Sequence, residues 1–518
     1  MNGKLGAALA NRMQAVREHD TLDVHVFLTG EPAREVAAAA TDAFGDSADT
    51  LDSPVGASRP DVVRGMKNRA AEHQTDLLSF FHEQQELPHA VDSLIDDGTV
   101  LSVSVPPVSR VRPYWITNSI SVQISPDMLA RIAEREDVQH IELIRHATLE
   151  DLLDDAPDLW PDKEFTDDTT NDVAWSVRRI NAPLLWQQDL TGDGVLVAVI
   201  DTGVNYHHPD LRERMWDGGD AYPNHGFDFA STDGDPMDQQ GHGTACAGIV
   251  AGDGTSGTKT GVAPGASIMA IRVGGDEEQF WAGMQFAIDR GVQVISMSMS
   301  WKYPSSPTYP GWRRMSEAIG AAGIVHANSI GNQGDDLSAY PVPYNIATPG
   351  NCPPPWMHPS QQPVGGVASA IGCGATDDSD RLAVYSGRGP AAWEDGPYTD
   401  YAYDSGGKPG LIKPDVCAPG PGTLSCHWRY KLDPGTPPYV AFSGTSAATP
   451  HVAGCIALLV QACIRSGNAV VPARIQEALE QTAVRITGQS QDKENHYGSG
   501  RVDVYEAFKF GVQAGWWA

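Results

Sequence analysis

The sequence predicts an α/β fold built on a doubly wound parallel sheet, with a small α+β domain before it. From residue 195 onwards, short apolar runs alternate with helical segments, an order typical of parallel strands joined by helices. The first 150 residues instead combine strands of alternating polarity with helical stretches. The chain has 518 residues, of which 41% are hydrophobic, so it can support a core for each region.

The N-terminal region carries the patterns of two helices packed on a sheet, with a further short helix. Strands are expected at 22–30, 100–105, 108–114, 120–124 and 138–144, and helices at 31–43, 59–86 and 126–134. Residues 44–58 are small and polar and indicate a loop. We therefore expect an unassigned N-terminal extension over 1–58 and a domain over 59–146.

An acidic segment separates the two regions. Ten Asp or Glu residues and one Lys lie between positions 150 and 172. A run of like charges is typical of a solvated linker. We expect a linker with a processing site over 147–174 and a catalytic domain over 175–518.

The C-terminal region contains the apolar runs that buried parallel strands require. These runs lie at 195–200, 267–273, 292–297, 323–327 and 369–373, and the helical segments lie at 243–251, 278–289, 312–322 and 446–466. Residues 341–366 and 390–410 are rich in Pro or polar residues, so we expect them as surface insertions.

Composition excludes several classes of function. The net charge of −30 argues against binding to nucleic acid or to an anionic membrane. The seven cysteines include no CxxC pair for zinc, and free thiols are favoured, with a Cys352–Cys373 bond as the alternative. The N-terminus has no signal-peptide core, and no apolar run reaches the roughly 18 residues of a membrane span. We expect a cytoplasmic protein, with export by another route left open.

Four polar residues lie at small-residue junctions of the C-terminal region. Asp201 follows an apolar strand, His242 lies between two glycines, Asn332 follows the run at 323–327, and Ser446 precedes a long apolar helix. Each alone has a plain structural interpretation, as a turn or helix-start residue. Together they meet the needs of serine catalysis, which requires a base for the hydroxyl, a carboxylate for the base and donors for the oxyanion.

Three sequence blocks resemble the motifs of the subtilisin-like serine proteases, the subtilases: 199–203, 242–244 and 444–451. Supporting matches at 261–264, 413–420 and 498–502 extend the resemblance to about residues 175–508. It implies a serine endopeptidase acting on a protein or peptide. Asp201 would orient His242, His242 would act as base and then acid, and Ser446 would attack the carbonyl, while Asn332 and the Ser446 N–H would form the oxyanion hole.

The resemblance also implies secondary sites. Ser298, Met299 and Ser300 stand in the place of the strand that aligns substrate, with Ser300 where the family often has Gly. Cys246 stands where thiol-sensitive members carry a cysteine, although a role as a small buried hydrophobe is favoured. No cofactor is required.

Calcium is a frequent ligand in this family, and Asp210 matches one ligand position of a common site. The loop at 253–259 that should complete the site lacks the usual Asn and carries Lys259. Because Ca²⁺ prefers several oxygen ligands and negative charge, we do not expect that site, and calcium elsewhere stays open.

The region 59–145 resembles the inhibitory propeptide of subtilases, mainly through 114–122 and 138–145. This resemblance implies folding assistance and intramolecular inhibition, with the segment after Arg145 lying in the active site. The protein would then be an autoprocessed zymogen.

Two alternatives differ from this interpretation. One is a catalytically silent, peptide-binding homologue that retains the fold. The other is an α/β-hydrolase acting on esters, which fails because that class needs a second Gly where Ala448 stands and the order Ser, Asp, His.

Overall fold

A computed structural model describes residues 3–17, 20–44, 58–85, 89–94, 100–153, 172–362, 364–394, 398–404 and 406–518. Among these, the residues up to Arg145 form one compact unit and those from His146 to Ala518 form a second. Most of the predicted 44–58 loop and the 154–171 part of the predicted linker lie outside the described residues.

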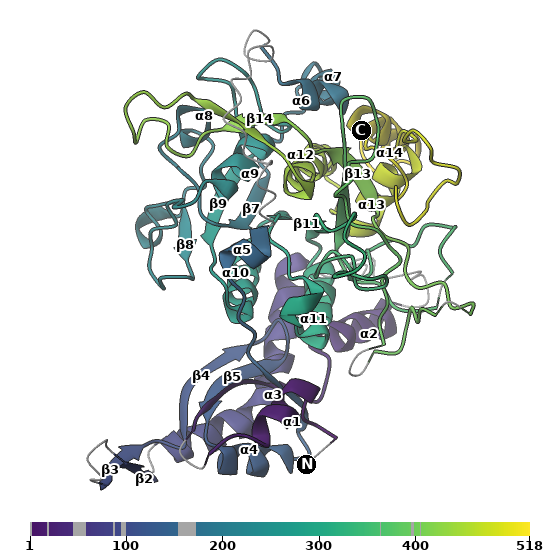
Figure 1. The fold of residues 1–518 in the computed structure, drawn as a ribbon. Coiled ribbons are helices and arrows are strands. Elements are labelled where there is room, and N and C mark those ends of the chain that lie inside the picture. Colours follow the sequence, from purple (N-terminus) through teal and green to yellow (C-terminus); the bar gives the residue numbers. More distant parts are fainter. Residues whose placement is uncertain are drawn as a thin grey trace. The chain divides into compact units, whose positions relative to one another are not determined.

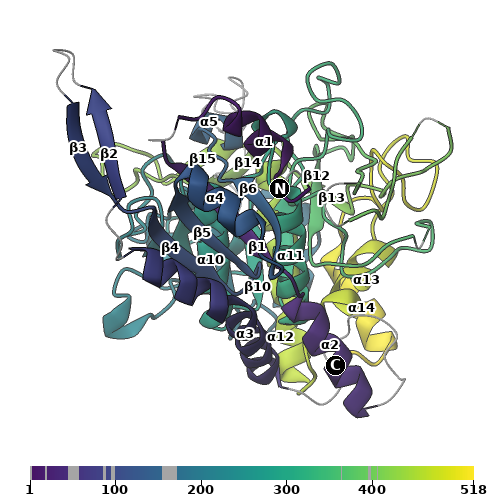
Figure 2. The same ribbon diagram turned by 90° about the horizontal axis from the view of Figure 1, so that it is seen from below.

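The first unit is built on an antiparallel sheet with the strand order β4–β5–β1–β6, which Figure 2 shows side by side. Its strands are β1 (Leu22–Leu28), β4 (Val108–Tyr114), β5 (Ser119–Ile124) and β6 (Val138–Leu143), and a separate hairpin consists of β2 (His89–Leu94) and β3 (Val100–Val105). Its helices are α1 (Ala7–Met13), α2 (Pro32–Phe44), α3 (Arg59–Gln85) and α4 (Pro126–Ala133). Strands β1 and β3–β6 and helices α2–α4 lie close to the segments expected from the sequence, whereas α1 and β2 were not expected.

The structure differs from the expected extension over 1–58, because β1 is an inner strand of this sheet. It pairs with β5 on one side and β6 on the other. Val24 and Val26 are fully buried in the core of the unit. The alternation of apolar residues along β1 therefore places residues 22–28 in the same unit as 59–145.

The second unit contains a seven-stranded parallel sheet with the order β13–β12–β11–β10–β7–β9–β8. The strands are β7 (Leu196–Asp201), β8 (Gly226–Asp228), β9 (Ser267–Arg272), β10 (Val294–Met297), β11 (Val325–Ser329), β12 (Ile371–Thr376) and β13 (Val416–Pro419). This sheet confirms the predicted α/β class. The chain order reverses between β7 and β10, where parallel sheets commonly place a ligand crevice at the carboxyl ends of the strands.

Helices and a hairpin complete the second unit. The helices are α5 (Leu149–Leu153), α6 (Trp175–Arg179), α7 (Ala182–Trp186), α8 (Pro209–Arg212), α9 (His242–Ala251), α10 (Glu277–Asp289), α11 (Tyr309–Ala321), α12 (Thr445–Arg465), α13 (Pro472–Gln481) and α14 (Val504–Gln513). Short 3₁₀ turns lie at Gly219–Ala221 and Tyr303–Ser305, and the hairpin pairs β14 (Thr423–Cys426) with β15 (Tyr439–Phe442).

Helix α12 forms the centre of this core and packs beside β11, β12 and β13 (Figure 1). By length and composition it is the one described helix that could cross a membrane, but 94% of its apolar stretch is buried inside the protein. A helix that is apolar on all its faces is stable when it is buried on every side in the core of a protein.

The segments expected as surface insertions are partly packed into the second unit, while Val364 and residues 406–409 stay exposed. Arg313 of α11 is fully buried, and its guanidinium donates to Glu317 and to Asp400 of the second insertion. The guanidinium also lies 5.2 Å from the ring centroid of Trp393 and 4.8 Å from that of Tyr398. A buried cation needs carboxylate or aromatic partners, and the second insertion supplies both kinds through Asp400, Trp393 and Tyr398.

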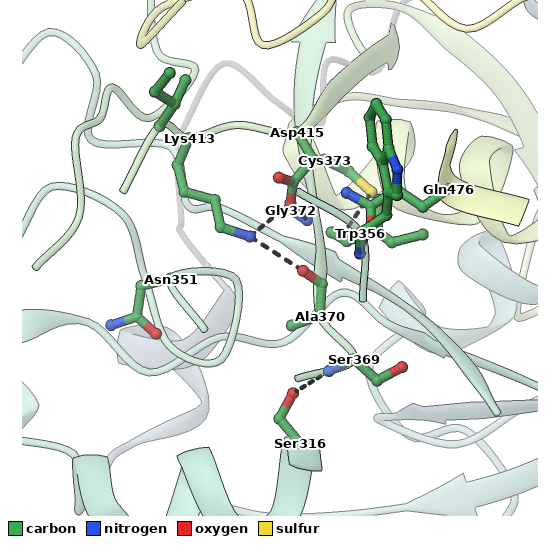
Figure 3. A network of polar contacts seen from close by, with 12 residues as sticks. Ser316, Asn351, Trp356, Ser369, Ala370, Gly372, Cys373, Lys413, Asp415 and Gln476 are labelled. Carbon is green, nitrogen blue, oxygen red and sulfur yellow. Dashed lines mark hydrogen bonds and ion pairs between the residues drawn. The ribbon is translucent and has the colours of Figure 1, made fainter. Parts of the chain in front are cut away.

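A buried ion cluster ties β13 to the C-terminal part of the chain. Lys413 Nζ donates to Ala370 O at 3.0 Å and to Asp415, as Figure 3 shows. Lys493 Nζ donates to the other Asp415 oxygen at 3.0 Å and to Glu480 at 2.9 Å. Two ammonium groups thus face two carboxylates, which compensates the charges in a dry environment.

Candidate active site

Asp201 ends β7 at the point where the order of the sheet reverses. Its side chain is fully buried, and Oδ1 accepts a hydrogen bond from Thr202 N at 2.8 Å. The same oxygen lies 2.7 Å from His242 Nδ1. A carboxylate in this place fixes the Nδ1–H tautomer of the imidazole and leaves Nε2 as the basic nitrogen.

His242 is the first residue of α9 and is 2% exposed. Gly243 follows it because a Cβ at that position would lie 2.2 Å from Gly203 O. Phe442 of β15 packs edge-on against the imidazole, with ring centroids 5.2 Å apart. The ring is therefore held on one side by Asp201 and on another by Phe442.

Asp238 organises the junction between β7 and α9, although no pattern in the sequence marks it. Its Oδ1 accepts from Gly241 N at 2.8 Å and from Thr202 Oγ1 at 2.9 Å, and its Oδ2 accepts from Thr244 N at 2.9 Å. Burial raises the pKa of this carboxyl, and the hydrogen bonds oppose that shift. It joins the residue after Asp201 to the turn before His242, a role that only the structure reveals.

Ser446 lies in the first turn of α12, directly after the turn made by Gly444. Gly444 has φ 113°, a left-handed conformation that favours glycine. The first N–H groups of a helix lack intrahelical partners, so the Ser446 N–H is available to an anion. The Ser446 hydroxyl donates to Ser298 O at 3.3 Å, and no hydrogen bond joins it to His242 Nε2 among the described residues.

Asn332 follows β11 and faces the same turn. Its Oδ1 accepts hydrogen bonds from Thr445 N at 2.8 Å and from Thr445 Oγ1 at 2.9 Å. This contact fixes the orientation of the amide. A Cβ placed on Gly444 would lie 3.1 Å from Asn332 Nδ2, so the donor group of the amide borders the start of α12.

The segment 298–300, which follows β10, borders Ser446 directly. Ser298 Oγ donates to Ser446 O at 3.0 Å, and Ser298 O also accepts from Ser329 Oγ at 2.9 Å. Met299 is fully buried and Ser300 is 1% exposed. The backbone of this segment is thus fixed beside the candidate nucleophile.

Residues 146–153 lie along this segment, and we call them the strap. At its start, Ala147 N donates to Gly275 O at 2.7 Å, and His146 forms an antiparallel bridge with Asp276. A Cβ on Gly275 would lie 1.8 Å from Ala147 O, so glycine permits the close approach.

The end of the strap is the short helix α5. Ser300 N donates to Leu152 O at 3.4 Å, and Lys302 Nζ donates to Asp151 O. Leu152 is 1% exposed and Leu153 is 7% exposed. The strap therefore lies against the segment 298–300, which the sequence predicts to align substrate.

A cavity of about 380 Å³ adjoins Asn332. Gln333, Tyr340 and Lys302 line it, and Asp151 of the strap contributes to its wall. The cavity is large enough for a side chain beside the predicted oxyanion site.

Cys246 lies one helical turn after His242. Its Sγ is 3.8 Å from His242 Nδ1 and donates to Ser446 O at 3.7 Å. Like the other six cysteines it is buried and unpaired, in agreement with the predicted free thiols. Burial raises the pKa of the Cys246 thiol well above its usual value, and the Asp201 charge adds to that shift, so the group stays a neutral thiol.

Asp210 lies in α8, nine positions after Asp201 in the chain and in the same unit. It is fully buried and is surrounded by His208, Cys426 and Tyr439. The structure thus brings together Asp201, His242, Ser446, Asn332 and the segment 298–300, and it keeps Asp210 in a separate cluster.

Comparison with known proteins agrees with these features. Residues 192–500 match the Subtilase family profile. The chain is 30% identical to thermitase of Thermoactinomyces vulgaris over 357 residues, which cover 66% of this chain and 100% of thermitase. It is 28% identical to M-protease of Shouchella clausii over 449 residues, covering 85% and 92% of the two chains. Bacillopeptidase F of Bacillus subtilis is 26% identical over 474 residues, covering 87% of this chain but 28% of that protein.

Proposed function

The chain belongs to the subtilase family of serine peptidases, and from this premise we propose that it is a serine endopeptidase acting through Asp201, His242 and Ser446. The observation that carries the proposal is the 2.7 Å contact between buried Asp201 Oδ1 and His242 Nδ1. This contact supplies an oriented base at the edge of the sheet where Ser446 lies in the first turn of α12.

The proposed reaction begins when the Ser446 hydroxyl exchanges its acceptor, Ser298 O, for His242 Nε2. His242 takes the proton as Oγ bonds to the peptide carbonyl carbon, and Asp201 stabilises the imidazolium. His242 then gives this proton to the leaving amine as the C–N bond breaks. A water then gives a proton to His242 as its oxygen bonds to the acyl carbon, and His242 returns that proton to Ser446 Oγ as the bond between Oγ and the acyl carbon breaks.

The negative oxygen of each tetrahedral intermediate would be held by two donors. They are the Asn332 amide, whose orientation Thr445 fixes, and the Ser446 N–H at the start of α12. The helix dipole adds a favourable field at the same place.

We further propose that the protein is a zymogen in which the first unit and the strap act as an intramolecular inhibitor. The support is the position of the strap, whose Ala147 N donates to Gly275 O and whose Leu152 O accepts from Ser300 N beside Ser446. A peptide substrate needs the same backbone groups, so the strap and a substrate would compete.

Intact mass measured over time on the wild type and on Ser446→Ala tests both parts. We expect the wild type alone to lose an N-terminal fragment by a cut between Arg145 and Ile180. If both proteins stay at full length, self-processing is contradicted, and the activity is then measured on peptides after loosening the strap with Leu152→Asp.

A catalytically silent, peptide-binding protein is the second candidate. The observation in its favour is the Ser446 hydroxyl, which donates to Ser298 O rather than to His242. Peptide binding by the Leu152→Asp variant without any Ser446-dependent hydrolysis would favour this candidate over the endopeptidase.

A further inference from the structure

The buried cluster around Asp210 joins three parts of the second unit: α8, the loop 253–259 and β15. Asp210 Oδ1 accepts a hydrogen bond from Ser256 N at 2.7 Å. Its Oδ2 accepts one from the Tyr439 hydroxyl at 2.8 Å. Each oxygen of this fully buried carboxylate therefore has a protein donor.

Tyr439 is fixed as a donor to Asp210. Its hydroxyl oxygen accepts from Thr258 N at 2.9 Å, so its own proton is directed to the carboxylate. Burial, with the adjacent Asp210 charge, raises the pKa of Tyr439 above its usual value, and the phenol keeps its proton.

The carboxylate on the loop is engaged elsewhere. Asp253 Oδ1 accepts from Thr255 N at 2.9 Å and from Thr255 Oγ1 at 2.7 Å. Its Oδ2 lies 3.7 Å from Arg214 Nε. Asp253 thus stabilises its own turn and pairs with a cation, which removes the loop acid that could have completed an oxygen-ligand site.

The other ligand-type atoms near Asp210 are nitrogen and sulfur. His208 Nδ1 lies 3.9 Å from Asp210 Oδ1, and Cys426 Sγ belongs to the same buried group. Both imidazole nitrogens of His208 have partners, since Nδ1 accepts from Asp210 N at 3.2 Å and Nε2 donates to Pro438 O at 2.9 Å. Ca²⁺ takes six to eight oxygen ligands, so these residues do not fit it.

We propose that this corner is a metal-free lock, in which Ser256 N–H and Tyr439 O–H satisfy the Asp210 carboxylate in place of a divalent cation. The lock joins α8, which follows Asp201 in the chain, to β15, which leads into Ser446. A second bond, from His208 Nε2 to Pro438 O, reinforces the same junction. The lock therefore stabilises the relative position of the two chain segments that carry the acid and the nucleophile.

Thermal unfolding of the Ser446→Ala protein tests the lock without interference from self-digestion. We expect the Tm to stay the same in EDTA and in millimolar Ca²⁺. A site filled at one hundred times its Kd would instead raise the Tm by about 3 °C. Because unfolding is measured on an inactive variant, the result does not depend on the proposed activity.

Tyr439→Phe, made in the Ser446→Ala protein, removes one hydrogen-bond donor from Asp210. We expect the Tm to fall by about 2–4 °C, because a hydrogen bond to a buried charge is lost. Tyr430→Phe is the matched control, since the described residues offer its hydroxyl no hydrogen bond, and its Tm should not change.

Three results would overturn the lock. They are an EDTA-induced fall in Tm that Asp210→Asn abolishes, an unchanged Tm in Tyr439→Phe, and a rise in Tm with Zn²⁺ that Cys426→Ser abolishes. An EDTA effect of equal size in the Asp210→Asn variant would place the ion elsewhere and support the lock.

Discussion

Two buried charged clusters of the second unit can be compared directly. In the ion cluster, Lys413, Asp415, Lys493 and Glu480 are each 3% exposed or less, and their charged groups face one another. In the candidate active site, Asp201 and His242 are buried to the same degree, but the imidazole has Nε2 directed away from its carboxylate partner.

The difference lies in what each cluster leaves for a ligand. The ion cluster consumes its hydrogen-bonding capacity within the protein, so its contribution is to stability. The candidate site keeps one nitrogen, one hydroxyl and a helix N-terminus beside a groove, a more costly arrangement that a reaction requires. Substitutions in the candidate site should therefore lower activity, and substitutions in the ion cluster should lower stability.

The largest expected effect is on catalysis. Ser446→Ala should lower kcat by about 10⁶-fold, because the nucleophile is lost, without lowering the Tm. Peptide hydrolysis and thermal unfolding measure the two quantities. Ser443→Ala, three residues earlier, is the control and should retain most activity. Equal activity in wild type and Ser446→Ala would remove the proposed nucleophile.

The second effect is on stability alone. Lys493→Met should lower the free energy of unfolding by about 3–5 kcal/mol, because Asp415 and Glu480 lose a buried partner. Urea unfolding in the Ser446→Ala background measures it. Lys509→Met is the matched control, since its pair with Glu506 is exposed to solvent and should contribute little. A change of similar size in both variants would contradict the role of the ion cluster.

The third expected effect is on kcat and arises in the candidate site. Asn332→Ala should lower kcat by about 10²–10³-fold and leave KM nearly unchanged, because the amide acts on the transition state. Steady-state kinetics on one peptide separate the two constants. A rise in KM with kcat intact would instead assign Asn332 to ground-state binding.

The last expected effect is a dependence of stability on pH. Burial lowers the pKa of His326 to about 3 and that of His451 to about 4. In the unfolded chain both would titrate near 6.5, so below that pH the unfolded state binds more protons. The free energy of unfolding should therefore fall as the pH drops from about 6.5 to about 4. Urea unfolding of Ser446→Ala across this range measures the slope, which His326→Gln should reduce; an unchanged slope would contradict the assignment.

The sequence predicts most of the second unit because its strands and helices have strong patterns. The apolar run at 195–200 became β7, and the long apolar stretch after Ser446 became α12. Short elements such as β8 and the hairpin of β14 and β15 have little periodicity and were not predicted. Packing of the second insertion also escaped prediction, because it depends on contacts of Arg313 with Trp393 and Asp400, which are distant in sequence.

The candidate residues were predictable because each stands in a distinctive glycine-rich motif. Asp238 was not, because it lies in an ordinary polar turn and its role depends on five hydrogen bonds across the β7–α9 junction. Tyr439 escaped prediction for the same reason, since its partner Asp210 lies 229 positions away. Long-range hydrogen bonds of this kind leave no local pattern.

Labelling with a small fluorophosphonate tests the central claim most directly, because such a probe needs the activated serine and little of the groove. Peptide mapping by mass is done on the wild type, Leu152→Asp, His242→Ala and Ser446→Ala. We expect one adduct on Ser446 in the wild type, faster labelling in Leu152→Asp, and none in the other two. Folded wild type and Leu152→Asp proteins that both stay unlabelled would contradict an assembled Asp201–His242–Ser446 triad.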